Sequence, residues 1–363
     1  MLLAWFDLIP SAASTLLFAA GWMAGWLMLW RGRQLPPAAA QRPSIAVVVP
    51  ARNEASGIGV LARSVMPQLR AGDEFVVVDD HSCDATAAIA RAAGATVIEC
   101  PALPDAWAGK PHACHVGAIH TTAEIVLFLD ADVRLGVGEL DRLATAVHAA
   151  PDTLVSMQPW HRTERAGEQW SMPFNIAALM GSAAFTVAGS RVRCRVAFGP
   201  VMALARERYE AMGGHAHPAV RSAVLEDIAL ARLATRTELF TGSPNGTTFQ
   251  MYPDGIRSLV EGWTKGFGIG FDATPWWAVI ATAAWVTSVA GGWLTSPWFA
   301  LATLVQVAVL ARRAGGFRWY AVAGAPVLIA FFAVVCAGSI FRRYTGRAVT
   351  WKGRTLRPDQ ETG

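Results

Sequence analysis

The chain has 363 residues, of which 53% are hydrophobic and 16% are charged, whereas about 25% are charged in typical soluble domains. Its net charge of +4 is small and its arginines cluster beside apolar runs, which argues against nucleic acid as a partner and for charge flanking a membrane. The five scattered cysteines contain no C-x-x-C spacing, which argues against a disulfide framework and fits a reducing compartment.

The first apolar segment, Leu8 to Trp30, carries no charge and is long enough to span a bilayer. Arg31 and Arg33 follow it, whereas a cleaved signal peptide has its basic residues before the apolar run. We therefore expect residues 1–33 to form an uncleaved transmembrane anchor, with the following chain in the cytoplasm. The residues 34–43, rich in Pro and Ala, are predicted to be a linker.

The next segment alternates strand-like and helix-like stretches, which predicts an α/β domain with a mostly parallel, Rossmann-like sheet. We assign residues 44–272 to this domain. The predicted strands are Ile45–Val49, Glu74–Val78, Thr96–Glu99, Ile125–Asp132 and a returning strand, Val196–Ala205. The predicted helices are Gly57–Leu69, Ala85–Ala93, one that opens at Trp107–Lys110, and Glu207–Met212.

The strand Ile125–Asp132 reads I-V-L-F-L-D-A-D and ends in two acids. Alternate strand residues point the same way, so Asp130 and Asp132 would stand together where open α/β sheets bind ligands. Two close carboxylates need a positive partner, and a divalent cation with oxygen ligands, Mg²⁺ or Mn²⁺, is expected. The alternative for an isolated D-x-D is that one acid caps the next turn.

Two neighbouring strands also end in polar residues, at Pro50–Glu54 and at Asp79-Asp80. The chain has no G-x-G-x-x-G or Walker loop at these ends, so a typical dinucleotide or P-loop site is not predicted. Carboxylates at successive strand ends suit a nucleotide sugar that is held by its base on one side and through a metal at its diphosphate on the other.

The later apolar segments predict further contact with a membrane. Residues 170–190 are free of charge but contain Pro173 and Asn175, so we predict an interfacial or re-entrant helix there. Residues 275–341 are predicted to hold two to three spans, drawn from Trp277–Trp293, Pro297–Leu310 and Tyr320–Ile340. Three full spans would place the basic tail, residues 342–363, outside, whereas the positive-inside rule favours the cytoplasm.

Seven short segments occur in the order found in family-2 glycosyltransferases of the inverting, GT-A-fold class: I-A-V-V-V-P-A-R-N-E, V-V-V-D-D-H-S-C-D-A-T, W-A-G-K-P-H-A-C, F-L-D-A-D, A-F-G-P, L-E-D and E-G-W-T-K-G. The resemblance covers residues 44–272. Several segments, and the tail W-K-G-R, look closest to the membrane-bound branch that includes carotenoid (diaponeurosporenoate) glycosyltransferase.

The resemblance implies a donor side for a UDP-linked sugar. Asp80 would accept a hydrogen bond from uracil with support from Asp79, and further residues would border the uridine: Pro50, Arg52 and Glu54. Lys110 would approach the diphosphate or the sugar. Asp132 would be the main metal ligand, and Asp130 would bind the metal or the sugar.

The resemblance also implies an acceptor side. Inverting transfer to a hydroxyl needs a base, and this would be Asp227, with Glu226 as the alternative. An acid acceptor is already ionised, so a working Asp227 favours a hydroxyl. Trp263 and Lys265 stand where processive relatives carry Q-x-x-R-W, and this departure favours addition of one sugar. Trp263 and His215 would lie near the acceptor, and Lys265 would reach the diphosphate.

These expectations describe a multi-pass cell-membrane glycosyltransferase with a cytoplasmic catalytic domain. It would move one sugar, with inversion and with Mn²⁺ or Mg²⁺, from a nucleotide sugar to a carotenoid-like or isoprenoid-like lipid. The alternatives are a processive polysaccharide synthase and an inactive membrane scaffold that kept the fold. The sequence leaves open the sugar, the lipid and the oligomeric state.

Overall fold

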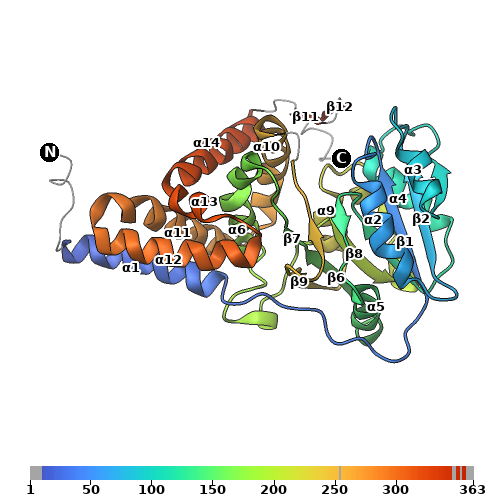
Figure 1. Ribbon diagram of the computed structural model, residues 1–363, viewed down its shortest axis with the longest axis horizontal. Helices are drawn as coiled ribbons and strands as arrows, with labels where there is room; N and C mark the ends of the chain where they lie inside the picture. Colours follow the sequence, from blue (N-terminus) through green and yellow to red (C-terminus); the bar gives the residue numbers. More distant parts are fainter. Residues whose placement is uncertain (1–9, 253–254, 346–348, 352–353, 357–363) are drawn as a thin grey trace. The chain divides into compact units, whose positions relative to one another are not determined.

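The computed structural model describes residues 10–252, 255–345, 349–351 and 354–356 (Figure 1). Contacts between residues divide this part of the chain into two units. The sheet unit comprises residues 33–160 and 193–250, and the helical unit comprises the described residues of 1–32, 161–192 and 251–358. The segment 161–192, which contains the predicted interfacial helix, therefore belongs to the helical unit.

Within the described residues, the sheet unit is built on seven strands in the order β3-β2-β1-β4-β8-β6-β9. Their bounds are β1 Ile45–Ala51, β2 Glu74–Asp79, β3 Thr96–Glu99, β4 Ile125–Leu129, β6 Thr153–Gln158, β8 Val201–Ala205 and β9 Arg236–Thr241. β8 runs antiparallel to β4 and to β6, while the other neighbouring pairs are parallel. The predicted α/β class with a mostly parallel sheet is confirmed.

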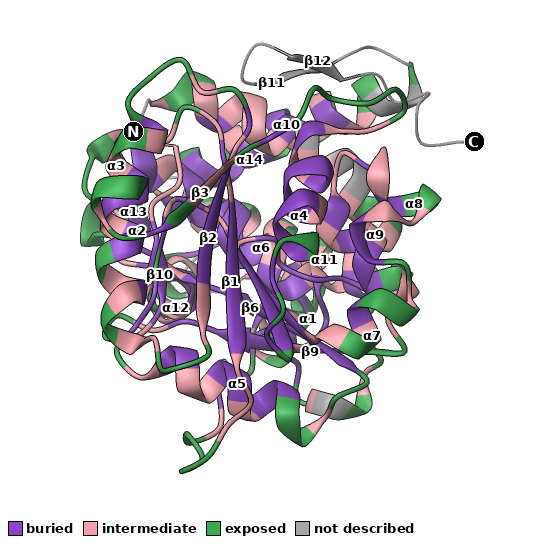
Figure 2. Ribbon diagram, turned by 90° about the vertical axis from the view of Figure 1, so that its right-hand side faces the viewer, coloured by how far each residue is buried: buried purple, intermediate pink, exposed green. Residues whose placement is uncertain are grey.

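The sheet is buried on both faces, as the apolar strands predict, and its strands are largely purple in Figure 2. One face forms a core whose largest members include Phe128 and Tyr209, with side chains from α4 (Gly109–Ile119), α7 (Arg206–Ala211), α8 (Pro218–Arg221) and α9 (Glu226–Leu233). Three further helices complete the unit: α2 (Ile58–Val65, continued by the 3₁₀ turn η2, Met66–Gln68), α3 (Thr86–Ala92) and α5 (Glu139–Ala149).

Two predicted strand bounds are wrong. β8 begins at Val201 and not at Val196, since the residues before it form a loop and a turn at Gly199-Pro200. The predicted end of β4 also differs. β4 ends at Leu129, and Asp130 begins a turn in which the Val133 N–H donates to the Asp130 carbonyl over 3.1 Å. Asp132 therefore lies in the turn that leads to β5 (Val133–Arg134), which pairs antiparallel with β10 (Thr248–Phe249). Two acids spaced i, i+2, as Asp130 and Asp132 are, occur both at the end of a strand and in a β-turn. The spacing alone therefore could not distinguish a strand from a turn here.

The helical unit contains the longer helices: α1 (Ala12–Met28), α6 (Met172–Gly181), α10 (Ile256–Ala273), α11 (Trp276–Thr295), α12 (Pro297–Ala314), α13 (Trp319–Ala323) and α14 (Ala325–Tyr344). By length and composition, two described segments could cross a membrane: Trp276–Thr295, with mean hydropathy 1.4, and Ala325–Arg342, with mean hydropathy 2.0. α1 has only 17 residues and is shorter than the predicted anchor, whose residues 1–9 lie outside the described part.

The predicted helix over 170–190 is wrong in extent. A 3₁₀ segment, η3 (Ala166–Ser171), precedes α6, which ends at Gly181. Ala183 then takes a left-handed φ of 57°, which an L-residue adopts in turns and not within a helix, and a second 3₁₀ turn, η4 (Gly189–Arg191), follows. Of the predicted basic tail, residues 346–348, 352–353 and 357–363 lie outside the described residues; β11 (Val349–Trp351) pairs with β12 (Arg354–Leu356).

Small residues and inter-helix hydrogen bonds join α1 to α11 and α12. A Cβ at Gly21 would meet the Ala284 carbonyl oxygen, so this glycine permits close approach of the two helices. The fully buried Gln306 accepts a bond from Trp285 Nε1 over 3.1 Å and donates to the Trp22 carbonyl over 2.6 Å. Such contacts hold helices together where lipid offers no polar partner.

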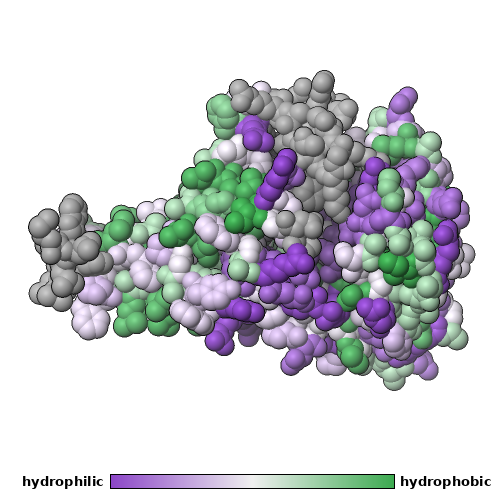
Figure 3. Space-filling view, turned by 45° about the horizontal axis from the view of Figure 1, so that its top comes forward, coloured by the Kyte–Doolittle hydropathy of each residue, from purple (hydrophilic) through white to green (hydrophobic). Residues whose placement is uncertain are grey.

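Large apolar side chains remain exposed on the helices of the helical unit, and green residues gather over part of this unit in Figure 3. Among the most exposed are Leu16, Leu17, Trp276, Ile280, Trp298, Val305, Val327 and Val334. An apolar surface of this extent on a soluble monomer is unusual and marks contact with lipid or protein.

Candidate active site

The polar strand ends meet at one edge of the sheet. β1 lies between β2 and β4 and is parallel to both, so the residues that follow the three strands emerge on the same side. This is also the point at which the strand order reverses, where open α/β sheets bind ligands. Arg52, Asp80 and Asp130 are the first polar residues beyond these ends.

The loops after β1 and β2 are fastened to each other by side chains. The Asn53 N–H donates to Ser82 Oγ over 3.0 Å, and Asn53 Oδ1 accepts from the Cys83 N–H over 2.8 Å. The Ala55 N–H donates to Asp84 Oδ2 over 3.1 Å. Asn53 and His81 adopt left-handed φ values of 55° and 58°, which are rare outside glycine and frequent at functional sites.

The predicted uridine-binding residues lie on these two loops. Arg52 Nη1 donates to the Asp80 carbonyl over 3.0 Å and lies 3.8 Å from Asp80 Oδ2. Asp80 is 6% exposed, and the buried Oδ1 of Asp79 has no hydrogen-bond partner among the described residues. The Glu54 N–H donates to Thr86 Oγ1 over 2.8 Å, and Pro50 is the penultimate residue of β1.

Lys110 joins two carboxylates that are far apart in the sequence. Its Nζ lies 2.7 Å from Asp130 Oδ1 and 2.7 Å from Glu226 Oε1. Burial of the ammonium acts to lower the pKa of Lys110, but its attraction to Asp130 and Glu226 prevails and raises this pKa well above the usual value. The two acids Asp130 and Asp132 were expected to need a positive partner. For Asp130, the structure shows that Lys110 supplies this charge.

Asp227 lies in the first turn of α9, beside Glu226. Its Oδ2 accepts from the Gly199 N–H over 2.9 Å, and its Oδ1 accepts from the Ile228 N–H over 2.8 Å. Burial and the neighbouring Glu226 charge raise the pKa of Asp227 to about 7, against the opposing effects of Lys110 and the two N–H groups. A carboxyl group with this pKa exchanges a proton readily at neutral pH.

Gly199 is a site residue to which the sequence assigned no role. A Cβ there would stand 3.1 Å from Asp227 Oδ2 and 3.4 Å from Lys110 Nζ, so a side chain would crowd the Asp227 carboxylate and touch the Lys110 ammonium. The segment A-F-G-P contained the signal, since a glycine before proline beside a strand marks a close approach. The sequence could not show that Asp227 and Lys110 are the groups that approach Gly199.

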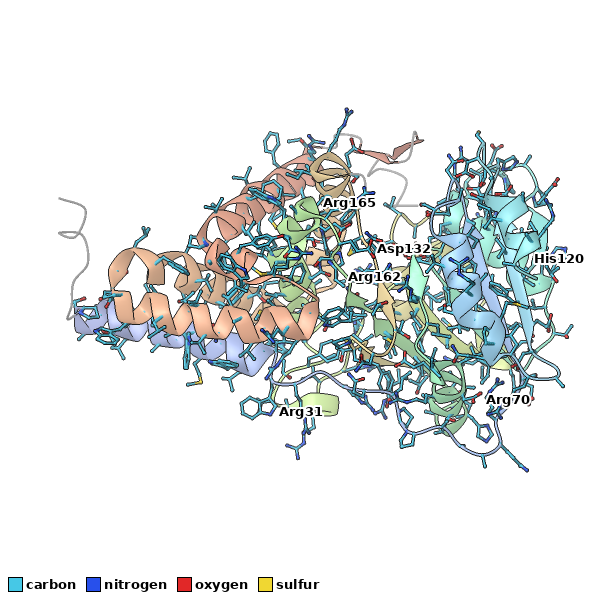
Figure 4. The ribbon with its side chains drawn as sticks, in the orientation of Figure 1. Arg31, Arg70, His120, Asp132, Arg162 and Arg165 are labelled. Atoms are coloured by element: carbon cyan, nitrogen blue, oxygen red, sulfur yellow. The ribbon has the colours of Figure 1, made fainter. Side chains whose placement is uncertain are left out.

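The donor set fits a hard divalent cation that arrives with phosphate. Among the described residues, no group of three or more His, Cys, Asp or Glu side chains surrounds a common point, so these residues supply no all-protein cage. Mg²⁺ sites for nucleotides use one or two carboxylates and complete their coordination with water and phosphate oxygens. Asp130 and Asp132 are partly exposed carboxylates of one turn and match that requirement; Asp132 is labelled in Figure 4.

Of the three predicted acceptor-side residues, one belongs to the sheet unit and two belong to the helical unit. His215 is fully buried in the sheet-unit core, where its Nδ1 lies 3.0 Å from the Tyr209 hydroxyl and its ring contacts Phe128. Burial lowers the pKa of His215 to about 3, so it is neutral. Trp263 belongs to the helical unit, where it stacks on Phe174 with centroids 5.2 Å apart. Lys265 lies on the same helix, and its side chain is outside the described part.

The sheet and its strand-end carboxylates are the expected parts of a sugar-transfer domain, and comparison with known families agrees. Residues 46–199 match the model of "Glycosyl transferase family 2". The chain belongs to this family of glycosyltransferases, and its domain has the GT-A-type α/β fold.

A curated relative matches most of the chain. It is the 4,4'-diaponeurosporenoate glycosyltransferase of Staphylococcus aureus, 31% identical over 332 residues, which cover 86% of this chain and 88% of the relative. Two solved structures are more distant. A mannosyltransferase from Pyrobaculum calidifontis, in complex with GDP-Man and Mn²⁺, has a TM-score of 0.49 and 21% identity, covering 91% of this chain and 96% of that chain. Glucosyl-3-phosphoglycerate synthase from Mycobacterium tuberculosis has a TM-score of 0.42 and 18% identity, covering 66% and 85%.

Proposed function

We propose that this glycosyltransferase moves one sugar, with inversion, from a UDP-linked donor to a carotenoid-like or isoprenoid-like lipid. The observation that supports this most is the Lys110 contact, which joins Asp130 at the donor end of β4 to Glu226 beside Asp227. Sugar transfer brings the diphosphate of the donor close to the proton that the acceptor loses. The donor-side carboxylate of Asp130 and the acceptor-side pair Glu226-Asp227 must therefore lie close together.

On the donor side, the fastened loops after β1 and β2 would hold the uridine against Asp80, Arg52 and Glu54. The turn carboxylates of Asp130 and Asp132 would hold Mn²⁺ or Mg²⁺, which supplies electrostatic stabilisation of the leaving diphosphate. Lys110 adds a second positive charge beside the same carboxylate. These groups favour departure of the diphosphate without taking part in covalent chemistry.

On the acceptor side, Asp227 would take the proton as the acceptor attacks the sugar carbon. Glu226 is nearly buried and is paired with Lys110, which stabilises its anion and weakens it as a base. Among the side chains that the structure describes, no ammonium pairs with Asp227 at contact distance, and its pKa of about 7 suits proton transfer near neutral pH. We therefore assign the base to Asp227 and the positioning of Lys110 to Glu226.

The relative's name points to an acid as its acceptor, because diaponeurosporenoate is a carboxylate. A carboxylate reaches the site already deprotonated, whereas a hydroxyl must lose its proton during attack. The raised pKa of Asp227 favours a hydroxyl, and the relative favours a carboxylate. A lipid of either kind fits a chain whose helices α11 and α14 are long and apolar enough to enter a membrane. We place the protein in the cell membrane with its sheet unit in the cytoplasm.

The experiment uses the full-length protein in detergent, a panel of UDP-hexoses, and Mn²⁺ or Mg²⁺. We expect one sugar on an isoprenoid alcohol or acid, measured by mass spectrometry, and loss of transfer by at least about a hundredfold in D130N. With a hydroxyl acceptor, kcat/KM should rise with pH around 7 and D227N should abolish this rise; with a carboxylate acceptor, D227N should retain most activity. Failure to transfer or hydrolyse any nucleotide sugar with either metal would refute the proposal.

A further inference from the structure

We propose that Lys110 is the resident counterion of the donor site: its ammonium occupies the Asp130 carboxylate until a divalent cation displaces it, and Glu226 then retains it. This inference rests on the proposed function and adds to it an order of events, in which the cation must compete with a charge that the protein itself provides.

The geometry gives Lys110 two anchoring points of different character. Its Nζ lies 2.7 Å from one oxygen of each carboxylate. The Asp130 side chain is 30% exposed, whereas the Glu226 side chain is 6% exposed. The Glu226 contact is therefore the more shielded from solvent, and the Asp130 contact is the one that a solute can reach. A lysine has a flexible four-carbon stem and can turn about one contact while it leaves the other.

A metal ion and the ammonium compete for Asp130 Oδ1. A divalent cation binds a carboxylate oxygen at about 2.1 Å, and the ammonium already lies in contact with the same oxygen. Two cations on one oxygen would repel each other strongly in a partly buried site. Binding of the cation must therefore break the Lys110–Asp130 pair or find a weaker position.

The space beside Gly199 and the Glu226 contact indicate where the released ammonium goes. Lys110 Nζ lies 3.4 Å from the position that a Cβ of Gly199 would take, and Asp227 Oδ2 lies 3.1 Å from the same position. The ammonium thus stays close to Glu226 and Asp227 when it leaves Asp130. Occupation of the donor side by a cation then changes the charge beside the acceptor-side carboxylates, which links the two halves of the site.

The test measures binding of Mn²⁺ alone to the full-length protein, from the loss of the free-ion electron paramagnetic resonance signal. Without donor, K110M should bind Mn²⁺ about five- to tenfold more tightly than wild type, because its competitor is gone. The control R52Q removes the same charge from a residue that pairs with Asp80 instead, and it should change the affinity by less than about twofold. D132N should weaken Mn²⁺ binding in both backgrounds.

A second measurement separates competition from general electrostatics. With saturating Mn²⁺, K110M should bind UDP more weakly than wild type, so one variant shifts the two affinities in opposite directions. Because K110M leaves Glu226 buried without its ammonium, K110M/E226Q provides the same Mn²⁺ test in a chain without that unpaired charge. Unchanged or weaker Mn²⁺ binding in both variants overturns the inference. If wild type binds neither Mn²⁺ nor UDP, the proposed function fails as well, which distinguishes the two outcomes.

Discussion

Asp227 combines a role in the site with a cost in stability. Its pKa is raised to about 7 from a usual value of 3.8, chiefly by burial and by Glu226. The unfolded chain loses this proton near pH 4, whereas the folded chain holds it until about pH 7. Between these values the folded state binds more protons, so its stability relative to the unfolded state falls as pH rises.

We therefore expect D227N to be more stable than wild type by about 1 to 3 kcal/mol at pH 8. The gain should vanish by about pH 3, where the Asp227 carboxyl group is protonated in the folded state and largely protonated in the unfolded chain. Thermal unfolding in detergent at the two pH values measures this. The control E99Q changes an exposed carboxylate, 83% accessible, and should have no effect. An equal shift at both pH values would show that the ionisation of Asp227 is not the cause.

At the scale of elements, a buried ion-pair cluster fixes the connection before β1 to the sheet. Arg42 donates to both oxygens of Asp73 over 2.8 and 2.6 Å, and its Nε donates to Asp141 of α5 over 2.6 Å. The Arg42 and Asp73 side chains are 2% and 1% exposed. Arg70 (Figure 4) adds a contact of 2.6 Å to Asp141.

R42M should destabilise the protein by about 3 to 5 kcal/mol, because it leaves the Asp73 carboxylate buried without its partner. The double variant R42M/D73L should recover most of the loss. Burial acts to raise the pKa of Asp73, but bonds from Arg42 and backbone N–H groups lower it. Wild type should therefore keep this stabilisation above about pH 4 and lose it as the pH falls further. Equal unfolding temperatures for R42M and wild type would contradict this account.

The sequence predicts a helix or strand well where a local pattern of apolar residues determines it. The Val- and Ile-rich strands β1, β2 and β3 appear within one or two residues of their predicted bounds. α5 also has an apolar stripe, with Leu140, Leu143 and Val147 buried, so its helical period is visible in the sequence even though no helix is predicted there. The pairing of Lys110 with Glu226 could not be read, because 116 residues separate them and only the tertiary fold brings them together.

At the scale of the whole molecule, the exposed apolar helices predict that the protein is integral to a membrane. α14 contains the more hydrophobic of the two candidate spans, with mean hydropathy 2.0, and Val334 on it is 72% exposed. We expect the full-length chain to stay in the membrane fraction through washes with high salt and with alkaline carbonate, and to enter solution with detergent, as followed by immunoblotting. Release by salt alone would indicate peripheral attachment.

The two units interleave along the chain, which crosses between them after residues 32, 160, 192 and 250. During synthesis, β6 therefore emerges from the ribosome before the helical-unit segment 161–192, and β9 emerges after it. The parallel pair of β6 and β9 cannot form until about residue 241 is made. No single cut releases a contiguous catalytic fragment. A soluble version for crystallisation must replace residues 161–192, whose helix α6 is almost wholly buried, with a short loop.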